Sequence, residues 1–174
     1  MIIRKSGRIF ESQRGFTLME IMVAISLVAL IAVSVSSATF QILRQSIKNR
    51  DYTSASQSTM NAVHWMSRDA EMAQTIQTGV NHGFPLTLRW IDWGSSVYQS
   101  VYSIENGVLK REYSHTGDGS VQTVLANYVD TVSGNTTIVY NNKILTVKIT
   151  ASIGSGSSVT TVTSTREIYM RSMP

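Results

Sequence analysis

The chain has 174 residues, enough for one domain with an added anchor or tail, and it contains no cysteine. This excludes disulfides, thiolate nucleophiles and cysteine-based metal sites. The formal net charge is +4, but residues 1–15 contribute +3 of it, so residues 16–174 carry about +1 and lack the basic surface expected of a nucleic-acid-binding protein.

A long apolar segment follows a basic leader. Residues 1–15 are polar and basic, residues 16–43 are mostly apolar, and residues 21–43 contain no charged side chain. Glu20 stands alone at the head of this uncharged run of 23 residues. As a helix at ~1.5 Å per residue the run would measure about 35 Å, enough to cross a hydrocarbon core of roughly 30 Å. We therefore predict that residues 16–43 form the transmembrane half of a helix.

The helical pattern continues beyond this segment. Residues 16–78 contain no proline or glycine, and Gly79 is the first stop signal. The pattern predicts one continuous helix whose outer half, residues 44–78, lays one face on a domain. The predicted inner stripe consists of Ala55, Thr59, Ala62, Met66, Ala70, Ala73 and Ile76. The predicted outer face consists of Gln57, Asn61, His64, Arg68 and Glu71.

Residues 79–174 are predicted to form a sheet domain, in which the pattern from Leu86 onward changes to a period of two, typical of half-buried strands. Asn106-Gly107 indicates a β-hairpin, Asn141-Asn142 indicates another more weakly, and the GSGSS stretch at 154–158 links the last two strands. We predict an α+β fold in which the long N-terminal helix packs on a small antiparallel sheet of four to six strands. The expected strand segments are 86–93, 96–104, 108–114, 145–152 and 158–170.

Few side chains suggest chemistry. His64, His82 and His115 are far apart in the sequence and lack metal-ligand spacing, so we predict no metal site, no catalytic residue and no cofactor. Asp118 is interpreted as a turn residue, with calcium ligation as the alternative. Residues 135–137, Asn-Thr-Thr, fit a glycosylation acceptor but are interpreted as a turn.

Two groups of larger side chains leave alternatives open. The adjacent Arg68 and Asp69 are candidates for an ion pair, made either with the sheet domain or with a partner subunit. The three tryptophans, Trp65, Trp90 and Trp93, are expected in the core between helix and sheet, with a role as interface anchors as the alternative.

Three interpretations compete for the N-terminal segment. A secretory signal peptide cleaved after Ala38 is disfavoured, because the apolar run exceeds the usual ~7 to 15 residues. In the second interpretation the segment is a plain signal anchor, and Glu20 is an incidental residue that snorkels toward the membrane surface. In the third interpretation, RGFTLME at residues 14–20 resembles the processing site of type IV pilins and pseudopilins. The resemblance implies cleavage between Gly15 and Phe16 by a prepilin peptidase, methylation of the new Phe16 amino group, and a role for Glu20 in subunit assembly.

This resemblance gives the isolated acid a physical purpose. A carboxylate at the centre of a membrane helix costs about 2.5 to 3.5 kcal/mol on insertion scales. In lipid, the Glu20 carboxylate of one subunit can neutralise the Phe16 ammonium of its neighbour and so set the register between helices. The partners implied are other pilin or pseudopilin subunits, the prepilin peptidase, an inner-membrane assembly platform and the lipid bilayer, with no nucleic acid.

Three further stretches, residues 65–76, 101–114 and 165–172, are similar to segments of J-type minor pseudopilins and W-type minor pilins. The expected function is a minor structural subunit, not an enzyme, of a type IV pilus or type II secretion pseudopilus, at or near the filament tip. The resemblance implies one pass through the inner membrane, with the C-terminal domain extracytoplasmic. The alternative is a signal-anchored extracytoplasmic binding domain that does not polymerise.

Overall fold

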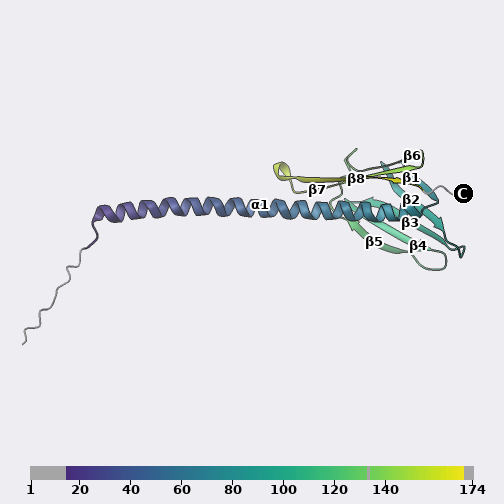
Figure 1. Cartoon of the computed structure of the whole chain (residues 1–174), viewed down its shortest axis with the longest axis horizontal. Helices are drawn as coiled ribbons and strands as arrows, with labels where there is room; N and C mark the ends of the chain where they lie inside the picture. Colours follow the sequence, from purple (N-terminus) through teal and green to yellow (C-terminus); the bar gives the residue numbers. More distant parts are fainter. Residues whose placement is uncertain (1–14, 133, 171–174) are drawn as a thin grey trace, which may run out of the picture. The chain divides into compact units, whose positions relative to one another are not determined.

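The computed structural model describes residues 15–132 and 134–170. The chain divides into two compact units, residues 1–45 and 46–174. Helix α1 (Leu18–Met72) precedes the strands, and the fold is α+β with antiparallel sheets, as predicted and consistent with a pilin-like fold (Figure 1). One sheet has the order β1 (Thr75–Gly79), β2 (Gly83–Ile91), β3 (Val97–Glu105), β4 (Val108–His115), β5 (Val121–Ala126). The other has β6 (Thr137–Asn141), β7 (Ile144–Ile153), β8 (Thr160–Tyr169).

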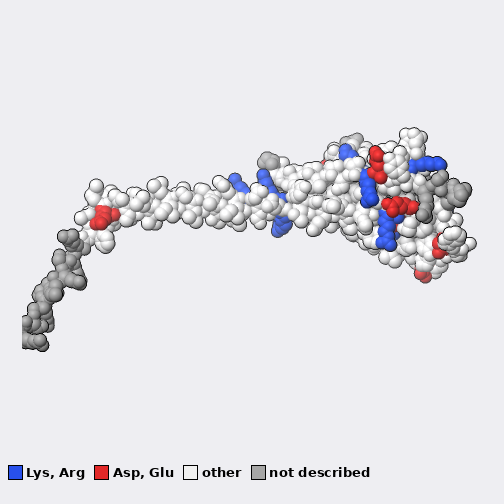
Figure 2. Space-filling model, in the orientation of Figure 1, with Lys and Arg blue, Asp and Glu red and all other residues white. Residues whose placement is uncertain are grey.

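The part of α1 in the first unit is apolar and exposed. Figure 2 shows a long stretch without Lys, Arg, Asp or Glu along the helix, which corresponds to residues 21–43. This stretch has the length and composition of a membrane span, and none of its most apolar window is buried in the protein. Four hydroxyl side chains here donate to the carbonyl four residues earlier, over 2.8 to 2.9 Å, so these donors need no water. They are Ser26, Ser34, Ser36 and Thr39.

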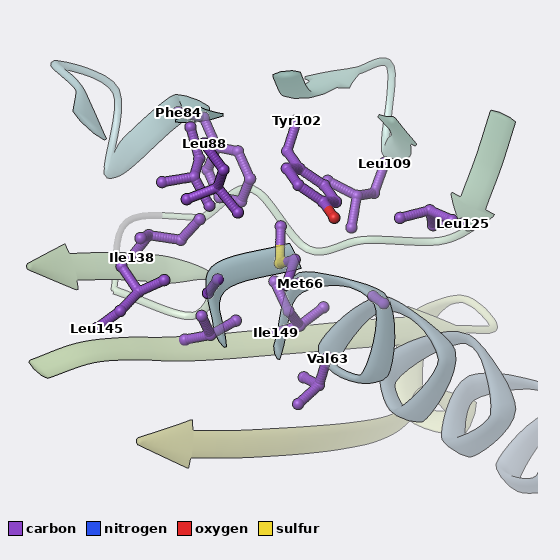
Figure 3. Packing of buried hydrophobic residues seen from close by; sticks show 14 of the residues in the cluster. Val63, Met66, Phe84, Leu88, Tyr102, Leu109, Leu125, Ile138, Leu145 and Ile149 are labelled. Carbon is purple, nitrogen blue, oxygen red and sulfur yellow. The ribbon is translucent and has the colours of Figure 1, made fainter. Parts of the chain in front are cut away.

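In the second unit, α1 buries the predicted stripe as far as Ala70. The core residues of the helix are Ala55, Thr59, Ala62, Val63, Met66, Ser67, Asp69 and Ala70, and the predicted outer face is exposed. Met66 lies between side chains of both sheets, with Tyr102 and Leu109 on one side and Leu145 and Ile149 on the other (Figure 3). The small residues of the stripe let the helix backbone approach the strands closely, so one core unites the helix with both sheets.

The predicted end of the helix at residue 78 is wrong, because α1 stops at Met72. No glycine or proline ends it. The amide of Gln74 instead donates to the carbonyl of Arg89 over 2.8 Å, and its side chain makes two hydrogen bonds with the Ile91 backbone. Residues 75–79 therefore continue as β1 along the edge of β2. Ile76 still packs against the core, now from a strand.

The prediction of a single sheet with four to six strands is also wrong. The described residues form one sheet of five strands and another of three, and β1, β5 and β6 lie outside the five expected strand segments. The Asn106-Gly107 hairpin is confirmed, with φ of 51° and 74°. The β6–β7 turn is also present, but its positive-φ residues are Asn142 and Lys143, one position later than predicted.

The two sheets meet at Gly83, the first residue of β2. The neighbouring carbonyl of His82 accepts a hydrogen bond from the amide of Ile138 at 2.8 Å. Gly83 has a φ of +91°, and a Cβ there would lie 2.3 Å from the Ile138 carbonyl oxygen. Only glycine tolerates both the positive φ and the close approach of the Ile138 carbonyl, so Gly83 allows β2 and β6 to lie side by side.

Candidate processing and assembly site

The predicted cleavage position is open to solvent. Residues 15–17 are not helical, and α1 begins at Leu18. Phe16 is 80% exposed, and a Cβ added at Gly15 would meet nothing within 4 Å. The Gly15–Phe16 peptide bond is therefore accessible backbone immediately before a regular helix. The predicted leader, apart from Gly15, lies outside the described residues.

Thr17 and Glu20 form a capping box at the start of α1. The amide of Glu20 donates to the Thr17 hydroxyl at 3.3 Å, and the amide of Thr17 donates to Glu20 Oε2 at 3.5 Å. Each side chain thus accepts a hydrogen bond from the backbone amide of the other residue, as in the Thr-x-x-Glu pattern. Sequence analysis missed this role of Thr17, although the spacing Thr17-Leu-Met-Glu20 was a readable signal.

The capping box aims the Glu20 carboxylate toward the N-terminal end of the helix. There it also faces the positive end of the helix dipole, which favours a negative charge. Among the ion pairs formed by the described residues, none includes Glu20. Its carboxylate therefore retains acceptor capacity close to the backbone of Phe16.

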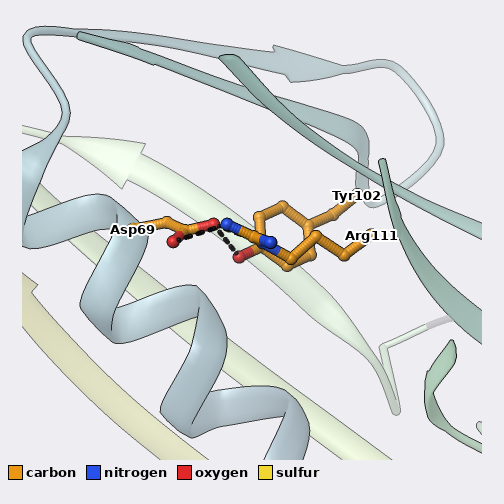
Figure 4. A network of polar contacts seen from close by, with 3 residues as sticks. All are labelled: Asp69, Tyr102 and Arg111. Atoms are coloured by element: carbon orange, nitrogen blue, oxygen red, sulfur yellow. Dashed lines mark hydrogen bonds and ion pairs between the residues drawn. The ribbon is translucent and has the colours of Figure 1, made fainter. Parts of the chain in front are cut away.

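A second polar centre joins α1 to the five-stranded sheet (Figure 4). Asp69 is 1% exposed and accepts from Arg111 Nε at 2.7 Å and from Arg111 Nη2 at 3.1 Å. The Tyr102 hydroxyl donates to Asp69 Oδ2 at 2.6 Å. The structure thus settles one open alternative, since Asp69 pairs with the sheet of its own chain. Sequence analysis did not predict Arg111 as the partner of Asp69, although the alternation of Leu109, Arg111 and Tyr113 on β4 places them on one face.

Burial and the charge of Asp69 together set the protonation of this centre. Removal of Tyr102 from water, and then the charge of Asp69 and its hydrogen bond, raise the pKa of Tyr102 far above its usual range. Partial burial acts to lower the pKa of Arg111, but the hydrogen bonds and charge of Asp69 outweigh it and raise that pKa. Tyr102 is thus a neutral donor and Arg111 a permanent cation.

Arg68 and the tryptophans have different environments. Arg68 is exposed and places its guanidinium 5.7 Å from the centre of the Trp65 ring. Trp90 is buried and Trp65 packs partly against the core, as predicted. Trp93 is fully exposed, so its predicted place in the core is wrong. It lies in the turn between β2 and β3.

The remaining candidates form no common site. The described residues contain no group of three metal-binding side chains. His115 pairs with Asp118 through Nε2 at 3.1 Å and stacks on Tyr98, while the other two histidines are exposed elsewhere. The amide of Asn135 donates to the Val132 carbonyl at 3.0 Å, which is the geometry of a turn.

Comparison with known families finds one match. The prokaryotic N-terminal methylation motif matches residues 12–36, a segment that spans the Gly15–Phe16 bond and the first part of the apolar run. No curated protein and no solved structure matches the chain. The motif supports a type IV pilin-like precursor, and with the apolar helix it suggests a membrane-anchored protein. The motif is that of a structural, not an enzymatic, family. The segments that resemble J-type and W-type subunits lie outside it.

Proposed function

We propose that the chain is a minor subunit of a type IV pilus or of a type II secretion pseudopilus. One observation carries the proposal. The methylation motif brackets an exposed, non-helical Gly15–Phe16 bond, directly before a helix long and apolar enough to cross a membrane. The proposed role is structural: the apolar half of α1 anchors the precursor and later packs among the helices of other subunits.

Processing would create the charge that assembly needs. Cleavage between Gly15 and Phe16 by a prepilin peptidase converts the Phe16 amide into an ammonium group, which the same enzyme then methylates. Thr17 remains attached, so the capping box with Glu20 persists after cleavage. The mature N-terminus thus carries one cation and one preoriented carboxylate, four residues apart.

Glu20 then pairs with the Phe16 ammonium of a neighbouring subunit. Two unit charges 4 Å apart attract by about 4 kcal/mol at an effective dielectric constant of 20. Sliding the helices apart would leave both charges unpaired in lipid, which is strongly unfavourable. The pair therefore holds each incoming helix at one axial offset, whereas purely apolar helices would slide.

The remaining features of the proposal follow from the resemblance to J-type and W-type subunits. The precursor crosses the inner membrane once, its sheet domain is extracytoplasmic, and an inner-membrane platform adds it to the filament at or near the tip. The satisfied hydroxyls and absent charges of residues 21–43 support the membrane anchor.

Mass spectrometry of the protein purified from its own cells tests the processing step. We expect loss of residues 1–15 and the gain of one methyl group on Phe16. A protein that still begins at Met1 contradicts the proposal and leaves the non-polymerising, signal-anchored binding domain as the function.

A matched pair of variants tests the role of the Glu20 charge. Glu20→Gln removes the charge but keeps a side chain able to complete the capping box, whereas Thr17→Ala weakens the cap by about 1 kcal/mol and keeps the charge. We expect both variants in the membrane fraction but only Thr17→Ala in sheared filaments. Wild-type recovery of Glu20→Gln in filaments contradicts the pairing, and loss of both variants would show that assembly needs the cap as well as the charge.

A further inference from the structure

A hollow of roughly 370 Å³ opens beside the last turns of α1, where they meet β2 and β4 in the second unit. Its walls include the aromatic rings of Trp65, Trp90 and Tyr113, together with the side chains of Arg68 and Arg111. Trp90 stacks on Tyr98 with ring centres 5.8 Å apart, which holds that wall in place. The volume lies within the range of ligand sites, about 300 to 1,000 Å³.

Two cations share one indole ring in this hollow. The Arg111 guanidinium lies 5.1 Å from the centre of the Trp65 ring, and the Arg68 guanidinium lies 5.7 Å from it. Asp69 neutralises Arg111, but Arg68 takes part in none of the ion pairs formed by the described residues. The hollow therefore carries one surplus positive charge on an exposed guanidinium.

The hydrogen-bonding capacity of the two guanidinium groups is also incompletely used. Arg111 donates to Asp69 from Nε and from Nη2, which accounts for two of the five N–H donors of an arginine. Arg68 is exposed and lies over the Trp65 ring, 5.7 Å from its centre, and its planar guanidinium carries five N–H donors. A carboxylate fits such a guanidinium with two parallel hydrogen bonds.

We propose that this hollow binds an acidic segment of a partner protein, through one side-chain carboxylate and an adjacent apolar residue. The carboxylate pairs with Arg68 and supplies the missing negative charge. The apolar neighbour packs against Trp65 and Trp90, because the hollow is larger than a carboxylate group alone and these two rings form part of its wall. This binding is separate from filament assembly through Phe16 and Glu20 and does not depend on it.

The test uses the full chain in detergent micelles and two blocked peptides. One is acetyl-Gly-Leu-Glu-Leu-Gly-amide and the other replaces Glu with Gln. Titration calorimetry and tryptophan fluorescence measure the dissociation constants. We expect the wild-type protein to bind the Glu peptide at least tenfold more tightly than the Gln peptide. This ratio should fall to near one in Arg68→Gln and stay unchanged in Arg89→Gln.

Arg89 is a matched control because it is an exposed arginine on β2, next to Trp90 in the sequence, whose side chain therefore lies on the opposite face of the strand. Near-UV circular dichroism checks that both variants keep the wild-type fold. Equal binding of the two peptides, no saturable binding of the Glu peptide up to millimolar concentration, or an unchanged ratio in Arg68→Gln overturns the proposal. Sodium acetate that binds as tightly as the Glu peptide overturns it too, since a simple anion would then suffice.

Discussion

Replacement of Asp69 by Asn should strongly destabilise the second unit. The substitution keeps the size of the side chain but removes the charge that compensates Arg111, whose side chain is only 11% exposed. An uncompensated charge in such a site typically costs 3 to 5 kcal/mol, and Tyr102 also loses a charged acceptor. We therefore expect Asp69→Asn to lower the free energy of unfolding by about 3 to 5 kcal/mol. That is a large share of the total of about 5 to 15 kcal/mol typical of a domain.

The measurement is urea unfolding of the full chain in micelles, followed by near-UV circular dichroism, which reports on the aromatic residues of this unit. The double variant Asp69→Asn with Arg111→Met removes both charges, so it should cost less than the sum of the single variants by about 2 kcal/mol or more, within the range measured for coupled residues. Glu105→Gln is the control, because its pair with Lys110 is exposed and should contribute less than about 1 kcal/mol.

Two results would refute this reasoning. A loss below about 1 kcal/mol in Asp69→Asn would mean that water or another acceptor satisfies Arg111 in the variant. Strict additivity of the two single variants would mean that the charges do not interact, despite their separation of 2.7 Å.

Two further predictions follow from other parts of the second unit. The raised pKa of Tyr102 means that the folded protein favours the neutral phenol. The stability that the neutral Tyr102 contributes is therefore complete below the unfolded pKa of about 10, and it is lost as the pH rises above that value. Ultraviolet absorbance titration should show one tyrosine that ionises only when the protein unfolds, and Tyr102→Phe should remove that late step; an unchanged titration curve contradicts the assignment. Gly83→Ala places a Cβ 2.3 Å from the Ile138 carbonyl oxygen at a φ of +91°, and it should cost about 1 to 3 kcal/mol in urea unfolding. The control is Gly117→Ala, which has a similar φ of +100° but open space around it, and an equal loss in both variants would show that backbone strain alone accounts for the effect.

Local sequence signals determined the N-terminal half of the protein and part of the sheet. The absence of charge over residues 21–43 predicts a membrane span. Such a span can be recognised from the sequence because it requires only an apolar composition and sufficient length. The buried stripe through Ala55, Ala62 and Met66 follows from a helical period that needs no knowledge of the partner surface. The Asn106-Gly107 hairpin was equally readable, because its two positive φ angles are a local requirement.

Tertiary structure decided where those local preferences give way. Residues 73–78 continue the helical pattern, yet the free edge of β2 takes up their backbone hydrogen bonds, and α1 ends at Met72. The division into two sheets depends on where strand pairing stops, between β5 and β6. The choice of Arg111 as the partner of Asp69 depends on a contact between residues 42 positions apart. A short-range pattern cannot encode such a choice, because any of several cations satisfies a buried carboxylate until the fold places one of them within reach.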